Sequence, residues 1–265
     1  MARNQHLDRL INLSAPYWAG EAEVVRTYWT TPTRTRETDR LWLMRQCFKE
    51  FWGSGVNKHD RGGVFMGALK SLAARAEEID LSLDRYEALE WLEGIKAEFS
   101  HYCAFADICD ELRPAGAPRL NPQILESWPE EDRLTALRFR HQAEHGALGL
   151  RACGFTEGGY CALFAEGRAL DGKGGIDDKI AKACALVYED EIDHMLAGIA
   201  GIANEGLSES DWLLLGELVV EQMKHRIHMR NAQFGLPLSE ARIAAIFRGD
   251  IEPVRFDYQR AGLAA

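Results

Sequence analysis

The chain has 265 residues, of which 46% are hydrophobic and 27% are charged, a composition typical of folded globular proteins. This composition excludes intrinsic disorder for the bulk of the chain. Thirty-one Lys and Arg residues against 41 Asp and Glu residues give a formal net charge of -10, so we expect neither a nucleic acid nor an anionic membrane surface as a partner.

The N-terminal segment reads MARNQHLDRL and lacks the apolar core of a secretory signal. No apolar run approaches the roughly 18 residues that a membrane-spanning helix needs. Six cysteines occur without a C-x-x-C pair, mostly in apolar, helix-like surroundings, and we expect them to be reduced core thiols. They are Cys47, Cys103, Cys109, Cys153, Cys161 and Cys184. Together these features predict a cytoplasmic protein.

The first half of the chain predicts three helices. Residues 1–36 are poorly periodic, and the loop at 30–39 ends in a helix start. From Asp39 to Phe51 apolar residues recur at helical spacing, and the Gly-Ser-Gly at 53–55 ends this pattern. A second helix is expected over 59–79 and a long third one over 86–112.

The second half predicts helices separated by clear breaks. Three prolines mark 113–122 as a loop, and Pro129 suits a first helical position before a pattern that continues toward Ala169, with an expected break at Gly154. Further helices are expected over 176–203 and 211–234, followed by one short C-terminal helix. The whole pattern predicts an all-α protein, a single helical domain over 1–265 with a bundle core at about 59–235 and extra helices at both ends.

One helix face combines a carboxylate and an imidazole with apolar neighbours. Glu98 and His101 form an E-x-x-H motif, and a spacing of three places both side chains on one side of a helix. The remaining residues of this face are Trp91, Gly94, Ile95, Tyr102 and Phe105. Burying a carboxylate without a partner is costly, and a metal ion is one way to compensate its charge.

A second long helix repeats the motif. Glu191 and His194 form another E-x-x-H, again on a face of apolar or small residues: Cys184, Val187, Tyr188, Met195 and Gly198. One such motif is weak, because it occurs by chance in many helical proteins. Two copies on apolar faces of separate helices predict metal ligation by Glu98, His101, Glu191 and His194.

This pair of motifs resembles the ferritin-like di-iron carboxylate superfamily. There, two further helices each add one carboxylate, which completes a site of four carboxylates and two histidines. The resemblance covers about 60–228 and implies a ferritin-like bundle that binds two iron ions, or manganese, and uses dioxygen as co-substrate. Oxygen and imidazole ligands without thiolate suit these metals.

Two residues compete for the third carboxylate. Glu157 is favoured, because its helical neighbours are apolar throughout and it lies about level with Glu191 around the turn near 173. Gly158 and Gly159 would also open space beside the metal. Glu144 is the alternative if the helix breaks at Gly154, although arginines flank it.

The fourth carboxylate is missing from the expected place. Reflecting Glu98 about the turn near 81 points to residues near 65, a stretch without an acid. Asp60 lies about one turn out of register, and Glu50 is separated from this helix by the break at 53–55. The last long helix offers Glu221 and His225, although Lys224 and Arg226 indicate that it is partly solvated.

These observations predict a non-haem di-iron oxidase or oxygenase acting on a small organic molecule. Tyr102 and Tyr188 adjoin the ligands and could donate hydrogen bonds to them. A homodimer is expected, and an external electron donor is left open. The alternatives are a ferritin-like ferroxidase or iron store, a haem-oxygenase-like di-iron oxidase, and a metal-free interaction protein. The haem-oxygenase-like alternative is disfavoured, because that fold typically has a further His one turn before the acid, and here this position is Val187.

Overall fold

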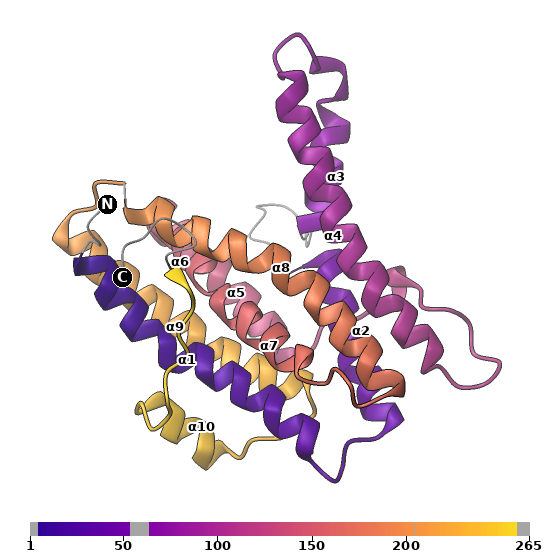
Figure 1. Cartoon of the computed structure of the whole chain (residues 1–265). Helices are drawn as coiled ribbons and strands as arrows, with labels where there is room; N and C mark the ends of the chain where they lie inside the picture. The colour runs from indigo at the N-terminus through magenta and orange to yellow at the C-terminus, as the bar shows by residue number, and fades with distance from the viewer. Residues whose placement is uncertain (1–4, 54–63, 204, 259–265) are drawn as a thin grey trace. The chain divides into compact units, whose positions relative to one another are not determined.

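The computed structural model describes residues 5–53, 64–203 and 205–258 and is built from α-helices (Figure 1). No strand forms within these ranges, so the predicted all-α class is confirmed. None of the helices in the described ranges has the length and apolar character needed to cross a bilayer.

The chain divides into two compact units. The inserted unit is Thr35–Trp128, and the discontinuous unit combines Met1–Arg34 with Pro129–Ala265. Each unit is described by itself below. A single domain over 1–265, with a bundle core at about 59–235, stays a prediction.

The inserted unit is built on a long helix that packs against two others. Its elements are α2 (Arg36–Trp52), α3 (Val64–Ala74), the short η1 (Ala76–Glu78), α4 (Arg85–Glu111) and the short η2 (Pro122–Ile124). Both α2 and α3 pack on α4. Thr35 caps α2 through a reciprocal capping box, and the Asp84 carboxylate accepts from two backbone N–H groups at the start of α4.

Buried side chains fix α2 along α4. Trp42 meets Phe105 edge to face, with ring centroids 6.3 Å apart, and both are almost wholly buried. The end of α2 is tied down as well, because Trp52 Nε1 donates to the Pro122 carbonyl at 2.8 Å. These contacts determine which residues of α2 face the middle of α4.

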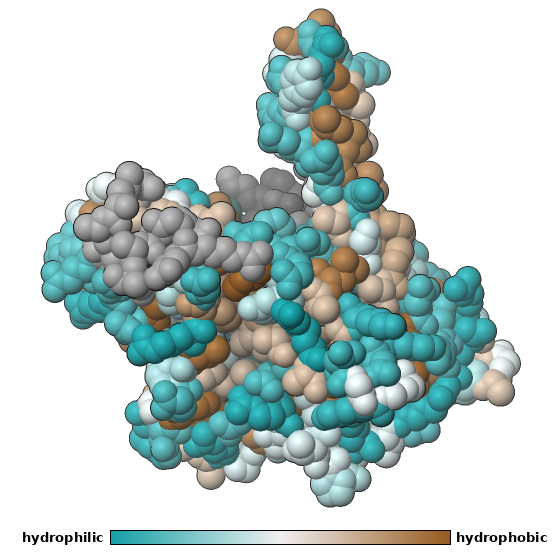
Figure 2. Space-filling view, viewed as in Figure 1, coloured by the Kyte–Doolittle hydropathy of each residue, from teal (hydrophilic) through white to brown (hydrophobic). Residues whose placement is uncertain are grey.

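The α3–α4 pair exposes an apolar face. Hydrophobic side chains gather along one side of it in Figure 2. Exposed leucines in this part of the chain are Leu69, Leu81, Leu89 and Leu92.

The discontinuous unit is built around two of its own long helices, α1 and α9, which pack side by side (Figure 1). Further pairs are α1 with α7, α7 with α8, and α5 and α6 with α9. Its elements are α1 (Gln5–Thr30), α5 (Pro129–His145), α6 (Ala147–Phe155), α7 (Gly158–Arg168), α8 (Gly175–Ala203), α9 (Glu209–Gln233) and α10 (Glu240–Phe247).

The N-terminal region is helical, which the sequence analysis does not predict. A 26-residue helix, α1, occupies the segment where no regular periodicity was found. Polar residues on its buried face obscure the pattern: Ser14 donates back to the Leu10 carbonyl at 2.8 Å, and Glu21 is ion-paired inside the core. Pro16 lies within the helix as well, which propensity alone disfavours.

The segment expected to form one helix from Pro129 forms three. The first break is at Gly146, whose φ of 53° suits glycine, and the second is at Thr156 and Glu157, two residues beyond the expected Gly154. Elsewhere α4, α8, α9 and the short α10 match the predicted helices. The helix expected over 59–79 ends earlier, at Ala74, while its start lies outside the described residues.

Candidate metal centre

Three ligand-type side chains meet inside the inserted unit. Glu50 comes from α2, and Glu98 and His101 come from α4. One ligand atom from each lies within 4.8 Å of the other two. His101 Nδ1 is 3.9 Å from Glu50 Oε2 and 3.9 Å from Glu98 Oε2. The Glu98 and His101 side chains therefore lie together, as the first motif predicts.

This cluster is largely shielded from water. The exposed fraction is 0% for the His101 side chain, 5% for Glu50 and 13% for Glu98. The Gln46 amide donates to Glu50 Oε1 at 2.5 Å, but a neutral donor leaves the carboxylate charge in place. A buried carboxylate and a largely shielded one, with ligand atoms within 4.8 Å of each other, form an arrangement that a cation would stabilise.

Two of the three donor separations in the cluster, those from His101 to each glutamate, are compatible with one first-row metal ion. Two donors that each bind one metal at about 2.1 Å can be at most about 4.2 Å apart, and 3.9 Å falls within that limit. Two carboxylates and one imidazole suit iron or manganese. Cys47, one turn before Glu50, is not among the described residues whose ligand atoms meet in this cluster. Burial, Cys109, Glu50 and Asp110 raise the pKa of its thiol well above the usual value.

Aromatic rings stand beside the cluster. Tyr102 is 5.1 Å from Phe51 and 5.8 Å from Phe99, measured between ring centroids. Phe65 packs against both phenylalanines, at 5.2 and 4.9 Å. Burial, followed by nearby Cys47 and Cys103, raises the pKa of Tyr102 to about 12, so its hydroxyl stays protonated at neutral pH.

The second predicted set lies in the discontinuous unit. Burial raises the pKa of Glu157, while Arg138, His194 and Arg226 are close enough to oppose that rise. The Cys161 thiol has its pKa raised by burial and further by Glu191 and Glu157. Glu157 directly precedes α7, which packs on α8, the helix that carries Glu191 and His194.

This second set is looser than the first. Glu191 is half-buried and His194 is exposed, so the expectation that His194 lies on a buried face is wrong. Among the described residues only Glu50, Glu98 and His101 bring their ligand atoms within 4.8 Å of one another. Because the two sets belong to different units, a single centre built from both stays a prediction.

The weaker candidates join neither set. Glu144 is exposed, with His145 Nε2 at 3.8 Å. Glu221 accepts from Arg140 at 2.8 Å and lies 3.2 Å from His141 Nε2. Burial lowers the pKa of the half-buried His225, and Asp60 lies outside the described residues.

Glu50 is the member of this cluster that the sequence analysis does not favour. It lies on the same helical face as Leu43, Gln46 and Cys47, which are fully buried. A carboxylate on that face was a usable signal. The Gly-Ser-Gly break separates Glu50 in sequence from the helix expected to pack beside Glu98, but α2 itself packs on α4.

Gly158 and Gly159 do not open space beside a metal. A Cβ at Gly158 would overlap the indole of Trp18, and one at Gly159 would overlap the carboxylate of Glu21. Both glycines therefore permit α7 to approach α1 closely. By contrast, Gly94 and Gly198 have no atom within 4 Å of such a Cβ, and Gly62 and Gly63 lie outside the described residues.

A charged network lies beneath these glycines. Glu21 accepts from Arg226 at 2.7 and 3.0 Å and from Arg230 at 3.1 Å, and all three side chains are buried. Both guanidinium groups also lie near the Tyr160 ring, 5.0 and 5.1 Å from its centroid. Arg226 is thus a core residue, and the expectation that it marks a solvated face is wrong.

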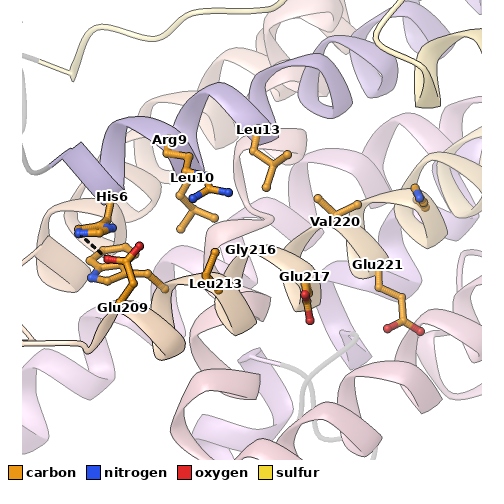
Figure 3. A pocket seen from close by; sticks show the side chains of 12 residues that line it. His6, Arg9, Leu10, Leu13, Glu209, Leu213, Gly216, Glu217, Val220 and Glu221 are labelled. Atoms are coloured by element: carbon orange, nitrogen blue, oxygen red, sulfur yellow. Dashed lines mark ion pairs between the residues drawn. The ribbon is translucent and has the colours of Figure 1, made fainter.

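A groove of about 450 Å³ runs between α1 and α9 (Figure 3). Its floor is apolar and includes Leu10, Leu213 and Val220, and one end is closed by His6, which pairs with Glu209 at 3.3 Å. Of the candidate ligands only Glu221 lines it. The Arg168 guanidinium lies over the ring of Tyr188, 4.7 Å from the ring centroid. A role of Tyr188 beside Glu191 stays a prediction.

Comparisons of the chain with protein-family models, with curated proteins and with solved structures found no match. The local geometry therefore carries the functional argument.

Proposed function

We propose that the protein binds iron and activates dioxygen to oxidise a small organic substrate. The observation that carries the proposal is the buried cluster of Glu50, Glu98 and His101, whose two carboxylates and one imidazole lie within reach of one metal ion. Its donors are hard oxygens and a nitrogen, which suit iron.

Two sets of the same composition support a two-metal form of this function. Each unit supplies one separate glutamate, Glu50 or Glu157, and one E-x-x-H motif on a long helix. Glutamates on two helices and E-x-x-H motifs on two others are the ligand pattern of ferritin-like di-iron proteins. We therefore propose two iron ions per chain and a ferritin-like relationship.

The roles of the chain's own residues follow from their surroundings. Glu50 and Glu98 would neutralise most of the metal charge, and His101 would bind through Nδ1, the nitrogen that faces both carboxylates. The buried rings of Phe51 and Tyr102, which follow Glu50 and His101 in the sequence and pack on each other, would limit access of water. Bound iron would supply the electrons that dioxygen chemistry requires.

Metal content tests the proposal directly. Protein loaded with ferrous ion under anaerobic conditions should retain two irons per chain after desalting. Glu50→Ala and His101→Ala should each lose the iron of the inserted unit, whereas Glu144→Ala, at an exposed glutamate, should match the wild type. Wild-type protein that retains no iron would overturn the proposal.

The magnetic state after exposure to air tests the two-metal form. Two ferric ions that share ligands couple and give no EPR signal at full iron content. Signals from isolated ferric ions, equal in amount to the total iron, would contradict a shared centre. With two irons bound per chain, they would indicate two separate one-metal sites, one of them at Glu50, Glu98 and His101.

A ferroxidase is the second candidate, and one observation favours it. Gly158 and Gly159 were expected to open a substrate pocket, but the space beside them is occupied by Trp18 and Glu21. A ferroxidase needs no organic pocket. Catalytic oxidation of excess ferrous ion, with formation of a mineral, would identify this function, whereas uptake limited to two irons favours the oxidase.

A further inference from the structure

Gln46 is buried beside the proposed ligand Glu50. Its side chain is 0% exposed, it lies one helical turn before Glu50 on α2, and its Nε2 is 2.5 Å from Glu50 Oε1. An ionised carboxylate can only accept hydrogen bonds, so the amide nitrogen must face it. The chemistry of the pair thus fixes the orientation of the Gln46 amide.

This bond constrains how Glu50 presents its second oxygen. With Oε1 held by Gln46, Oε2 is the atom that lies 3.9 Å from His101 Nδ1. Rotation of the carboxylate would break the hydrogen bond inside a site shielded from water, where an unsatisfied polar group is costly. Glu50 is therefore held in the orientation in which Oε2 faces the other two donors.

We propose that Gln46 is a positioning residue of the metal centre, which holds Glu50 ready to bind metal through Oε2. The inference rests on the proposed function, because it requires a metal at Glu50, Glu98 and His101. Groups that orient metal ligands typically contribute about 10- to 100-fold to metal affinity. We expect an effect of that size from Gln46.

A purely structural role for Gln46 makes a different prediction. A hydrogen bond between residues four apart could simply stabilise α2. Its loss would then lower the stability of the metal-free protein and leave the properties of the bound metal unchanged. Metal affinity and the spectrum of the bound metal separate the two roles.

Gln222 provides a matched control. It is also 0% exposed, and its side chain lies 3.4 Å from Arg138 Nε and 3.2 Å from His141 Nδ1. It belongs to the discontinuous unit, and its contacts include none of the three clustered ligands. Replacement of either glutamine by methionine keeps the side-chain length and removes the amide.

The experiment uses cobalt(II) as the probe in the full-length chain. Calorimetric titration gives the affinity, and the visible absorption of cobalt reports its ligand geometry. Gln46→Met should bind about 10- to 100-fold more weakly and shift the absorption bands, whereas Gln222→Met should match the wild type in both. Gln46→Asn, whose amide is one methylene too short to reach Glu50, should reproduce the loss if the methionine variant fails to fold.

Two outcomes are distinguishable. Wild-type affinity and spectrum in a folded Gln46→Met or Gln46→Asn protein would overturn the inference and leave the proposed function standing. Absence of any cobalt or iron binding by the wild type would overturn the proposed function, and the inference with it.

Discussion

Glu21 and Arg226 lie 205 positions apart in the chain, yet the Glu21 carboxylate accepts two hydrogen bonds from that guanidinium in the core of the discontinuous unit. Arg230 adds a third. Burial by itself raises the pKa of Glu21, but the two arginines outweigh it and hold the pKa below its usual value. The carboxylate is therefore ionised in the folded protein at neutral pH.

The first prediction concerns this network. Glu21→Ala leaves two buried guanidinium groups without their carboxylate, and removal of one partner of a buried pair costs about 3–5 kcal/mol. Urea denaturation should detect this loss in the free energy of unfolding. Glu23→Ala, which breaks the more exposed pair with Arg242, should cost about 0–1 kcal/mol. Equal losses in the two variants would show that burial of the network contributes nothing.

The second prediction concerns the close approach of α7 to α1. Gly159→Ala would push a methyl group into the Glu21 carboxylate, which two arginines prevent from moving aside, so we expect a destabilisation of about 1–3 kcal/mol. Gly154→Ala meets no atom within 4 Å and replaces glycine within α6, so it should be neutral or stabilising by up to about 1 kcal/mol. Thermal denaturation of both variants measures the contrast, and the reverse order would refute the packing role of Gly159.

The third prediction separates the two candidates for the third carboxylate. Glu157 is half-buried at the start of α7, which packs on the helix that carries Glu191 and His194, whereas Glu144 is exposed. Glu157→Gln should therefore lower the iron content of loaded protein, and Glu144→Gln should not. Elemental analysis of both variants gives the answer. Retention of all iron by Glu157→Gln would remove it from the ligand set.

The fourth prediction is a pH dependence of stability. Burial lowers the pKa of His141 in the folded protein, and this effect exceeds the opposing pull of Glu221. The unfolded chain, with an ordinary histidine pKa of about 6.5, then binds more protons than the folded one as the pH falls. The contribution of His141 should therefore lower the free energy of unfolding below about pH 6.5.

Denaturation of wild-type protein and His141→Gln between about pH 5 and pH 8 tests this sign. Glutamine carries no titrating group, so the variant should lose less stability on acidification than the wild type does. A steeper loss in the variant would mean that the Glu221 pair, rather than burial, controls the protonation of His141.

Helices with uninterrupted apolar faces could be predicted from the sequence. The faces of α4 and α8 carry few polar residues apart from the E-x-x-H motifs, so period and motif both point to the observed helices. The apolar face of α4 also identifies Glu98 and His101, because they stand out on it as polar residues. Their spacing within one helix is fixed by local geometry, which the sequence determines directly.

Other elements could not be predicted, because their polar side chains are paired with residues far away in the chain. Glu21 in α1 and Arg226 in α9 look solvated until each is placed beside the other. Glu50 was not favoured for a related reason. Its distance to His101 depends on how α2 packs on α4, and no periodicity within either helix reports that packing.

The division of the chain also orders events during synthesis. The inserted unit, Thr35–Trp128, is continuous and complete once residue 128 has been made, so its cluster of Glu50, Glu98 and His101 can assemble early. The helix α1 is made first but must wait for α9, because Glu21 meets Arg226 and Arg230 only after the ribosome has passed residue 230. Until then the Glu21 carboxylate lacks its two arginine partners, and the face of α1 that packs on α9 is not covered. Premature termination between residues 128 and 158, before both α7 and α9, should therefore yield a chain with an intact middle and an unpartnered first helix, prone to aggregation.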